Sequence, residues 1–157
     1  MVDRDFNEYS NGKKYNGLRY DEQLSKALII FKILGDEKTL DVGCGTGISS
    51  EPFNDVIGID PSEELLKYNK KTCFLASAED LPFDDDSFVN VISITAIHNF
   101  DDIKLGLSEI KRVGKRFGFS LLKRSSKTNK ILELIGDLFV VDEIIDQGTD
   151  LIIIASK

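Results

Sequence analysis

The feature that most constrains the fold is a glycine-rich segment that follows a short apolar run. Residues 39–50 read TLDVGCGTGISS, in which Gly43, Gly45 and Gly47 alternate directly after the acidic residue Asp41. Glycine is needed where the backbone turns sharply or approaches a ligand with no Cβ in the way. A simple turn from a strand into a helix would seldom need three glycines. The segment therefore indicates a nucleotide-binding loop at the end of a strand.

Short apolar runs alternate with stretches of helical periodicity along the chain, which is typical of a mostly parallel sheet flanked by helices. The periodicity predicts a helix over 17–34, with its apolar face at Leu24, Ala27, Leu28, Phe31 and Leu34. Strands are expected at 38–43, 56–60, 72–76, 88–95, 117–122, 138–145 and 150–156. Further helices are expected at 62–70, 102–113 and 127–136, with one of about two turns within 44–55. The connection DQGTD at 146–150 is too short for a parallel crossover, so the last strand should run antiparallel to its predecessor.

Length and composition indicate one domain over 1–157, made of an N-terminal aromatic segment and helix (1–34) and an α/β core (36–157). Cys44 and Cys73 have no CxxC spacing and no histidine cluster nearby, so we expect no metal site and no disulfide, as in a reduced cytoplasmic protein. No apolar run approaches the roughly 20 residues that span a bilayer, and no signal peptide is recognisable. A net charge of -7 argues against unaided binding to nucleic acid.

Asp60 ends the run VIGID nineteen residues after Asp41, where an acidic residue on the neighbouring strand would bind two ribose hydroxyls. A carboxylate suits that role because it offers only acceptors. Asp60 could equally cap the helix expected from residue 62, and both roles can hold together. The spacing GxGxG after an acidic residue differs from the GxGxxG of nicotinamide dehydrogenases, which serves a diphosphate on a helix N-terminus. It suits a ligand with a cationic amino acid tail.

Four segments together resemble the class I S-adenosylmethionine-dependent methyltransferases of the type 11 family: LDVGCGTG, VIGIDPSEELL, ASAEDLPFDDDSFVNVISITAIHNFDD and LSEIKRVGKRFGFSLL. The resemblance implies an α/β, Rossmann-like fold with a seven-stranded, mostly parallel sheet of order 3-2-1-4-5-7-6, its last strand antiparallel, and helices on both faces. It implies the cofactor S-adenosylmethionine, with S-adenosylhomocysteine as product, and methyl transfer to an unknown acceptor. That acceptor is a small molecule or a macromolecule presented by a partner.

The resemblance also assigns site residues. The cofactor-binding positions are Asp41, Gly43, Cys44, Gly45, Gly47, Asp60, Pro61, Ser77, Ala78, Glu79 and Thr95. In this assignment Gly43 and Gly45 face the methionine moiety, Asp60 holds the ribose, and the residues from 77 to 79 line the adenine. Ser77 stands where the family often has Asp.

The acceptor side is less determined by the sequence. His98, the only histidine, is a candidate general base, and packing or bonding a loop is the more ordinary role for it. Asn99 lies beside it. Lys123, Arg124 and Lys127 follow the strand expected at 117–122, where they could contact an anionic acceptor or belong to a solvated loop. Tyr9 and Tyr15 could place aromatic rings over the pocket, although a frayed terminus is as good an interpretation.

Two departures from the family pattern keep an alternative function open. The chain has GKRFG where relatives usually have a Pro-Gly-Gly turn, and it has no long insertion between the strands expected at 117–122 and 138–145 to roof a pocket. The acceptor site is therefore expected to be open, to be completed by the N-terminal segment or by a small protein partner. The alternative is a non-catalytic S-adenosylmethionine-binding subunit or sensor.

Overall fold

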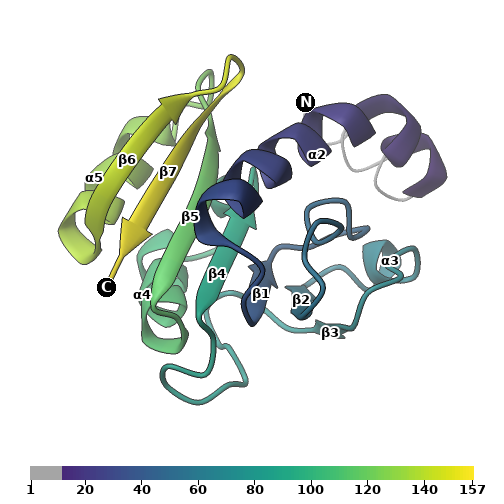
Figure 1. Ribbon diagram of the computed structural model, residues 1–157, viewed down its shortest axis with the longest axis horizontal. Helices are drawn as coiled ribbons and strands as arrows, with labels where there is room; N and C mark the ends of the chain where they lie inside the picture. The colour runs from purple at the N-terminus through teal and green to yellow at the C-terminus, as the bar shows by residue number, and fades with distance from the viewer. Residues whose placement is uncertain (1–11) are drawn as a thin grey trace.

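The computed structural model describes residues 12–157, and for residues 12–19 it describes the backbone alone. A seven-stranded sheet of order β3-β2-β1-β4-β5-β7-β6 forms its centre (Figure 1). The strands are β1 (Thr39–Val42), β2 (Val56–Asp60), β3 (Cys73–Leu75), β4 (Asn90–Ile94), β5 (Arg116–Leu122), β6 (Val140–Asp146) and β7 (Asp150–Ser156). The first five run parallel, and β7 is antiparallel to both β5 and β6. The predicted strand order and the antiparallel last strand are confirmed.

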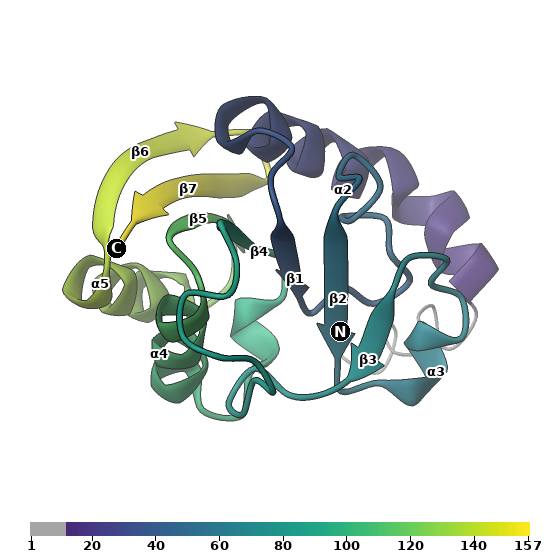
Figure 2. The ribbon, with the colours of Figure 1, turned by 60° about the horizontal axis from the view of Figure 1, so that its bottom comes forward.

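Helices cover both faces of this sheet. They are α2 (Gly12–Leu34), α3 (Glu63–Leu66), α4 (Ile103–Val113) and α5 (Thr128–Leu138), with a short 3-10 helix η1 (Ile97–Asn99) after β4. Figure 2 shows α2 on one side of the strands, with α4 and α5 together on the other. None of the helices in the described part of the chain is long and apolar enough to cross a membrane.

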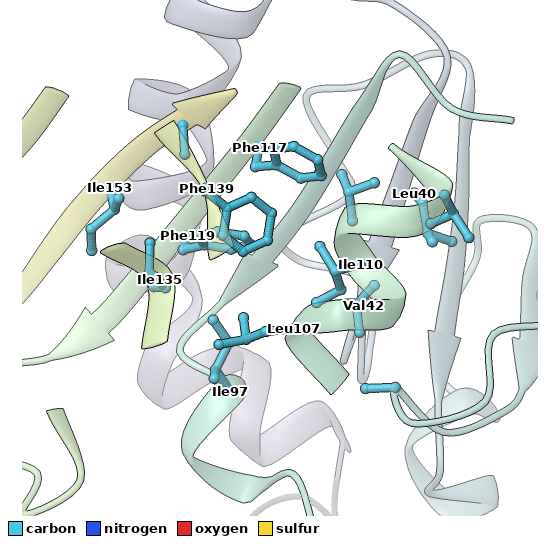
Figure 3. Packing of buried hydrophobic residues seen from close by; sticks show 14 of the residues in the cluster. Leu40, Val42, Ile97, Leu107, Ile110, Phe117, Phe119, Ile135, Phe139 and Ile153 are labelled. Atoms are coloured by element: carbon cyan, nitrogen blue, oxygen red, sulfur yellow. The ribbon is translucent and has the colours of Figure 1, made fainter. Parts of the chain in front are cut away.

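The alternation of strand side chains divides the apolar residues between the two faces. On one face, Val91 packs with Phe117, Phe119 and Phe139 beneath α4 and α5, and Figure 3 shows these aromatic rings in contact. The Phe117 and Phe139 ring centroids are 4.7 Å apart and meet edge to face. Ile92, the next residue of β4, points to the opposite face and packs against α2. The sheet is thus buried on both sides, which fits near-continuous apolar strands.

The helix α2 differs from the prediction in its start and in its buried face. It begins at Gly12, five residues earlier than expected. Leu28, expected to be buried, is 40% exposed, whereas Gln23 and Lys26 are buried on the same face as Ala27. Hydrophobic periodicity could not find this face because the helix crosses the polar ends of the strands, where buried polar side chains have partners.

The helix predicted within 44–55 is wrong. That stretch forms successive tight turns, with backbone bonds from Gly47 to Cys44 (2.9 Å) and from Ser50 to Gly47 (3.2 Å). Gly47 has a φ of 95°, which no α-helix accommodates, and the hydroxyl of Ser50 binds the carboxylate of Asp41. The helix predicted over 62–70 is also shorter, since α3 ends at Leu66.

Candidate functional site

A cavity of about 710 Å³ lies over the carboxyl ends of the parallel strands, a volume within the usual range for small-molecule sites. Its wall comes from the segments at the ends of the five parallel strands. The wall includes the glycine loop after β1, residues 60–62 at the end of β2 and residues 77–79 after β3. The residues from 95 to 101 other than Ile97, which follow β4, and Leu122 with residues 124–127, at the end of β5, also belong to it. In open α/β sheets, ligands bind at this edge, where the strand order reverses between β1 and β4.

The glycine loop is shaped by positions where a side chain has no room. Gly43 has a φ of 79°, and a Cβ there would lie 2.6 Å from the Cβ of Ala96 at the end of β4. A Cβ on Gly47 would lie 2.5 Å from Oδ1 of Asn69. The amide of Gly43 donates to the carbonyl of Ile59 (2.8 Å), which ties the loop to β2. The loop is therefore held against both neighbouring strand ends, with bare backbone facing the cavity.

Asp60 lies on the cavity wall at the end of β2. One carboxylate oxygen accepts the amide of Gly45 (2.9 Å) and the other accepts the amide of Ser62 (2.8 Å). Burial raises the pKa of Asp60, and these two amide bonds act in the opposite direction. The side chain thus caps the turn before α3, and each oxygen retains a lone pair for a ligand hydroxyl.

Asp41 lies beneath the glycine loop and does not line the cavity. Its Oδ2 accepts hydrogen bonds from the hydroxyls of Ser49 and Ser50, both at 2.6 Å. Its Oδ1 is buried without a hydrogen-bond partner among the described residues. Burial raises the pKa of Asp41 to about 6, and the two serine hydroxyls oppose that rise. Asp41 therefore holds the loop in shape from below, and Gly47 likewise lies outside the cavity wall.

The other positions assigned to the cofactor all line the cavity: Gly43, Cys44, Gly45, Pro61, Ser77, Ala78, Glu79 and Thr95. Burial raises the pKa of the Cys44 thiol, so this cysteine is held neutral. Oε1 of Glu79 accepts the amide of Asp102 (3.1 Å), which places the start of α4 beside the segment after β3. Among residues 12–157, no group of three or more histidine, cysteine, aspartate or glutamate side chains could hold a metal ion.

Thr95 connects the cavity to a buried ionic network that the sequence analysis missed. Its φ is 51°, a rare conformation for a β-branched residue and one that concentrates at functional sites. Its hydroxyl donates to Oδ2 of Asp150 (2.8 Å) and accepts from Nζ of Lys26 (3.2 Å). Lys26 and Asp150 are 1% and 0% exposed and form an ion pair at 3.0 Å. The only sequence signal was a lysine at helical spacing from Ile30, four residues later.

The acceptor-side residues fall into three groups. His98, Asn99 and Arg124 line the cavity. Lys123 does not, because its Nζ binds the carboxylate of Asp146 (2.9 Å). Tyr9 and the side chain of Tyr15 lie outside the part of the chain that the structure describes.

Of the three basic residues expected on this side after β5, Arg124 and Lys127 line the cavity and Lys123 does not. The Nζ of Lys127 donates to the backbone carbonyl of His98 (2.9 Å). Gln23 of α2 and the serines at 125 and 126 also line the cavity and were not predicted. Only the placement of α2 across the strand ends and of the loop after β5 brings these residues to the wall.

A mostly parallel sheet of this order, with a cavity over a glycine loop and an acidic residue ending β2, defines a Rossmann-like nucleotide-binding protein. A sequence model of the methyltransferase domain matches residues 40–122, which is more than half of the chain. The chain therefore belongs to the methyltransferase domain family.

Curated relatives match the chain over part of their length. An uncharacterized protein of Methanocaldococcus jannaschii is 36% identical over 100 residues, which cover 60% of this chain and 49% of the relative. A demethylmenaquinone methyltransferase of Renibacterium salmoninarum is 38% identical over 91 residues, 52% of this chain and 38% of that enzyme. The chain spans about half or less of the length of these relatives.

Solved structures match over nearly the whole chain. A SAM-dependent methyltransferase of Thermotoga maritima superposes with a TM-score of 0.79 at 19% identity, covering 97% of this chain and 98% of that one. A methyltransferase of Haloferax volcanii, solved in complex with the Trm112 methyltransferase activator, has a TM-score of 0.76 at 16% identity, with 96% of each chain covered. At these identities the likeness establishes the fold.

Proposed function

We propose that this protein is an enzyme that binds S-adenosylmethionine and transfers its methyl group to an acceptor. The observation that carries the proposal is the carboxylate of Asp60 on the cavity wall, fixed by the amide of Gly45 in the glycine loop. Membership of the methyltransferase domain family gives the reaction class. The apolar side chains of Ile48, Leu65 and Ala78 on the same wall suit an adenine ring.

The residues of this chain have three tasks in such a reaction. S-adenosylmethionine supplies an activated methyl group, so binding, orientation and exclusion of water are what the protein must add. Asp60 accepts the ribose hydroxyls while the bare backbone at Gly43 and Gly45 admits the amino acid tail. If the acceptor loses a proton during methyl transfer, His98 on the cavity wall accepts it. If it does not, His98 serves to position its loop, through its backbone carbonyl, which accepts a hydrogen bond from Lys127.

Calorimetry with S-adenosylhomocysteine tests the cofactor site. Asp60→Asn should weaken binding about tenfold, because one acceptor becomes an amide donor facing the ribose hydroxyls. Asp137→Asn is the matched control, since Asp137 is exposed on α5 away from the cavity wall, and it should leave binding unchanged. Absence of binding by the wild-type chain at millimolar ligand would refute the proposal. Turnover by the isolated chain would exclude the alternative of a non-catalytic subunit or sensor.

A second feature favours a catalytic subunit that works with a small protein partner. At the β3 edge of the sheet, Phe74 and Leu75 are 50% and 59% exposed, beside the partly exposed Tyr68. An open edge strand with apolar side chains is suited to pairing with another chain. The β6 edge is also apolar but contributes nothing to the cavity wall, whereas residues 77–79 follow β3 directly. The Haloferax volcanii methyltransferase, of the same fold, was solved in complex with the Trm112 methyltransferase activator.

Co-expression with an activator of the Trm112 type tests this partner. Phe74→Asp should abolish co-elution on size exclusion, because a charge on the β3 edge opposes its burial. Val140→Asp places the same charge on the opposite edge and should leave co-elution intact. Loss of co-elution with Val140→Asp, or its persistence with Phe74→Asp, would count against the β3 edge.

The proposal also covers the cellular compartment of the protein and its domain organisation. The chain acts as one domain in the cytoplasm, where its free cysteines, Cys44 and Cys73, stay reduced.

A further inference from the structure

The charges on the cavity wall are separated by sign. The carboxylates come from the β2, β3 and β4 side: Asp60, Glu64, Glu79 and Asp101. Glu79 holds the amide of Asp102, so Asp101 belongs to the same side as Glu79. The two lysine and arginine side chains on the wall, Arg124 and Lys127, both come from the segment between β5 and α5. The acidic side of the cavity matches a cationic sulfonium cofactor. The basic side is left for the methyl acceptor.

Arg124 and Lys127 differ in how they are held. Lys127 reaches the backbone carbonyl of His98 (2.9 Å), and it has no carboxylate partner in the described part of the chain. Arg124 makes no hydrogen bond or ion pair with any described residue, so its guanidinium keeps all its donors for a ligand. Lys123, one residue earlier, is neutralised by Asp146 and points out of the cavity.

Neutral donors extend this basic side. Ser125 and Ser126 line the wall between the two cations. The segment leads into the first turn of α5, and the N-terminal end of a helix carries partial positive charge. Paired cations, hydroxyls and a helix start are the groups that bind anionic oxygens.

We propose that the methyl acceptor carries an anionic oxygen group, a carboxylate or a phosphate, which Arg124 and Lys127 bind at the β5 side of the cavity. The inference rests on the proposed methyltransferase function and names the substrate class of that site. Arg124 binds the anion through bidentate hydrogen bonds, and Lys127 adds a point charge while it keeps its hydrogen bond to the backbone carbonyl of His98.

Anion binding to the cofactor-loaded protein tests the inference. The chain is first titrated with S-adenosylhomocysteine by calorimetry. The chain saturated with S-adenosylhomocysteine is then titrated with inorganic phosphate or with acetate, and NMR amide shifts report anion binding. Arg124→Gln should weaken the binding of one or both anions about tenfold, the loss expected for one charge-assisted contact. Arg124 has no hydrogen bond or ion pair with a described residue to lose, so this variant should fold like the wild type. The double variant Arg124→Gln with Lys127→Gln should abolish saturable binding.

Lys123→Gln is the matched control, because it removes the same charge from the neighbouring residue outside the cavity. It should change anion affinity by less than about twofold, as expected for a screened charge beyond the site. Selective binding of phosphate or of acetate identifies which group the acceptor carries. Equal losses in Lys123→Gln and Arg124→Gln, or no saturable anion binding to a chain that does bind S-adenosylhomocysteine, would overturn the inference while leaving the proposed function standing. Failure of S-adenosylhomocysteine itself to bind would overturn both.

Discussion

Replacing Lys26 with methionine removes one member of the buried ion pair that fastens α2 to the sheet. The variant leaves the carboxylate of Asp150 at 0% exposure, with hydrogen bonds from Thr95 (2.8 Å) and Thr149 (3.1 Å) and no opposite charge in contact. Breaking a buried pair in this way typically costs about 3–5 kcal/mol. The second contact of Lys26, at 3.5 Å to a Glu22 side chain that is 43% exposed, adds at most ~1 kcal/mol. The free energy of unfolding should therefore fall by about 3–5 kcal/mol.

Urea unfolding followed by circular dichroism measures this loss. Lys32→Met is the matched control, because Lys32 is exposed on the same helix without a partner among the described residues, and it should change stability by less than ~0.5 kcal/mol. The double variant Lys26→Met with Asp150→Leu should recover most of the loss, since no buried charge then remains unpaired. A loss below ~1 kcal/mol for Lys26→Met, or a double variant no more stable than the single one, would refute the reasoning.

Two further predictions concern the glycine loop. Gly43→Ala should destabilise the fold by about 2–5 kcal/mol, because the residue has a positive φ and the added Cβ would lie 2.6 Å from the Cβ of Ala96. Gly136→Ala on α5, where an added Cβ meets nothing within 4 Å, should stabilise the fold by up to ~1 kcal/mol. Thermal unfolding measures both changes, and a change of the same sign in the two variants would contradict the prediction. For Asp41, burial raises the pKa from 3.8 to about 6, so the folded state binds the proton more tightly and stability falls as pH rises through that window. Relative to Asp41→Asn, the wild type should lose up to about 3 kcal/mol between pH 4 and 7, at ~1.4 kcal/mol per tenfold change in proton affinity, and parallel stability curves for the two proteins would contradict this.

Three of the positions that the sequence analysis assigned to the cofactor line the cavity for local reasons. Gly43 and Gly45 line the cavity through their chain atoms, and Asp60 follows from the strand that ends in it. The errors have equally local causes. The helix expected within 44–55 was inferred from the alternation of strands and helices along the chain, while Gly47 and the serines that bind Asp41 favour successive turns. Ser49 and Ser50 bind a residue eight or nine positions earlier, and such hydrogen bonds leave no periodic pattern in the sequence.

The acceptor side shows the same limit for charged residues. Lys123 and Lys127 are equivalent in a sequence that places both after β5, and only the hairpin of β6 and β7 brings Asp146 beside Lys123. Likewise, Lys26 and Asp150 are separated by most of the chain and meet only because α2 crosses the end of β7.

The sequence by itself determined the alternation of strands and helices, the antiparallel last strand and the nucleotide loop, because those depend on local periodicity, on the length of the connection at 146–150 and on glycines that a short turn requires. The strand order came from the resemblance of four segments to the methyltransferase family. Tertiary structure alone decided which side chains surround the cavity beyond that loop. It buried Lys26 against Asp150, turned Lys123 away and placed Arg124 and Lys127 on the wall. The physical reason is that a long polar side chain takes its direction from partners brought close by packing, which the sequence around it does not specify.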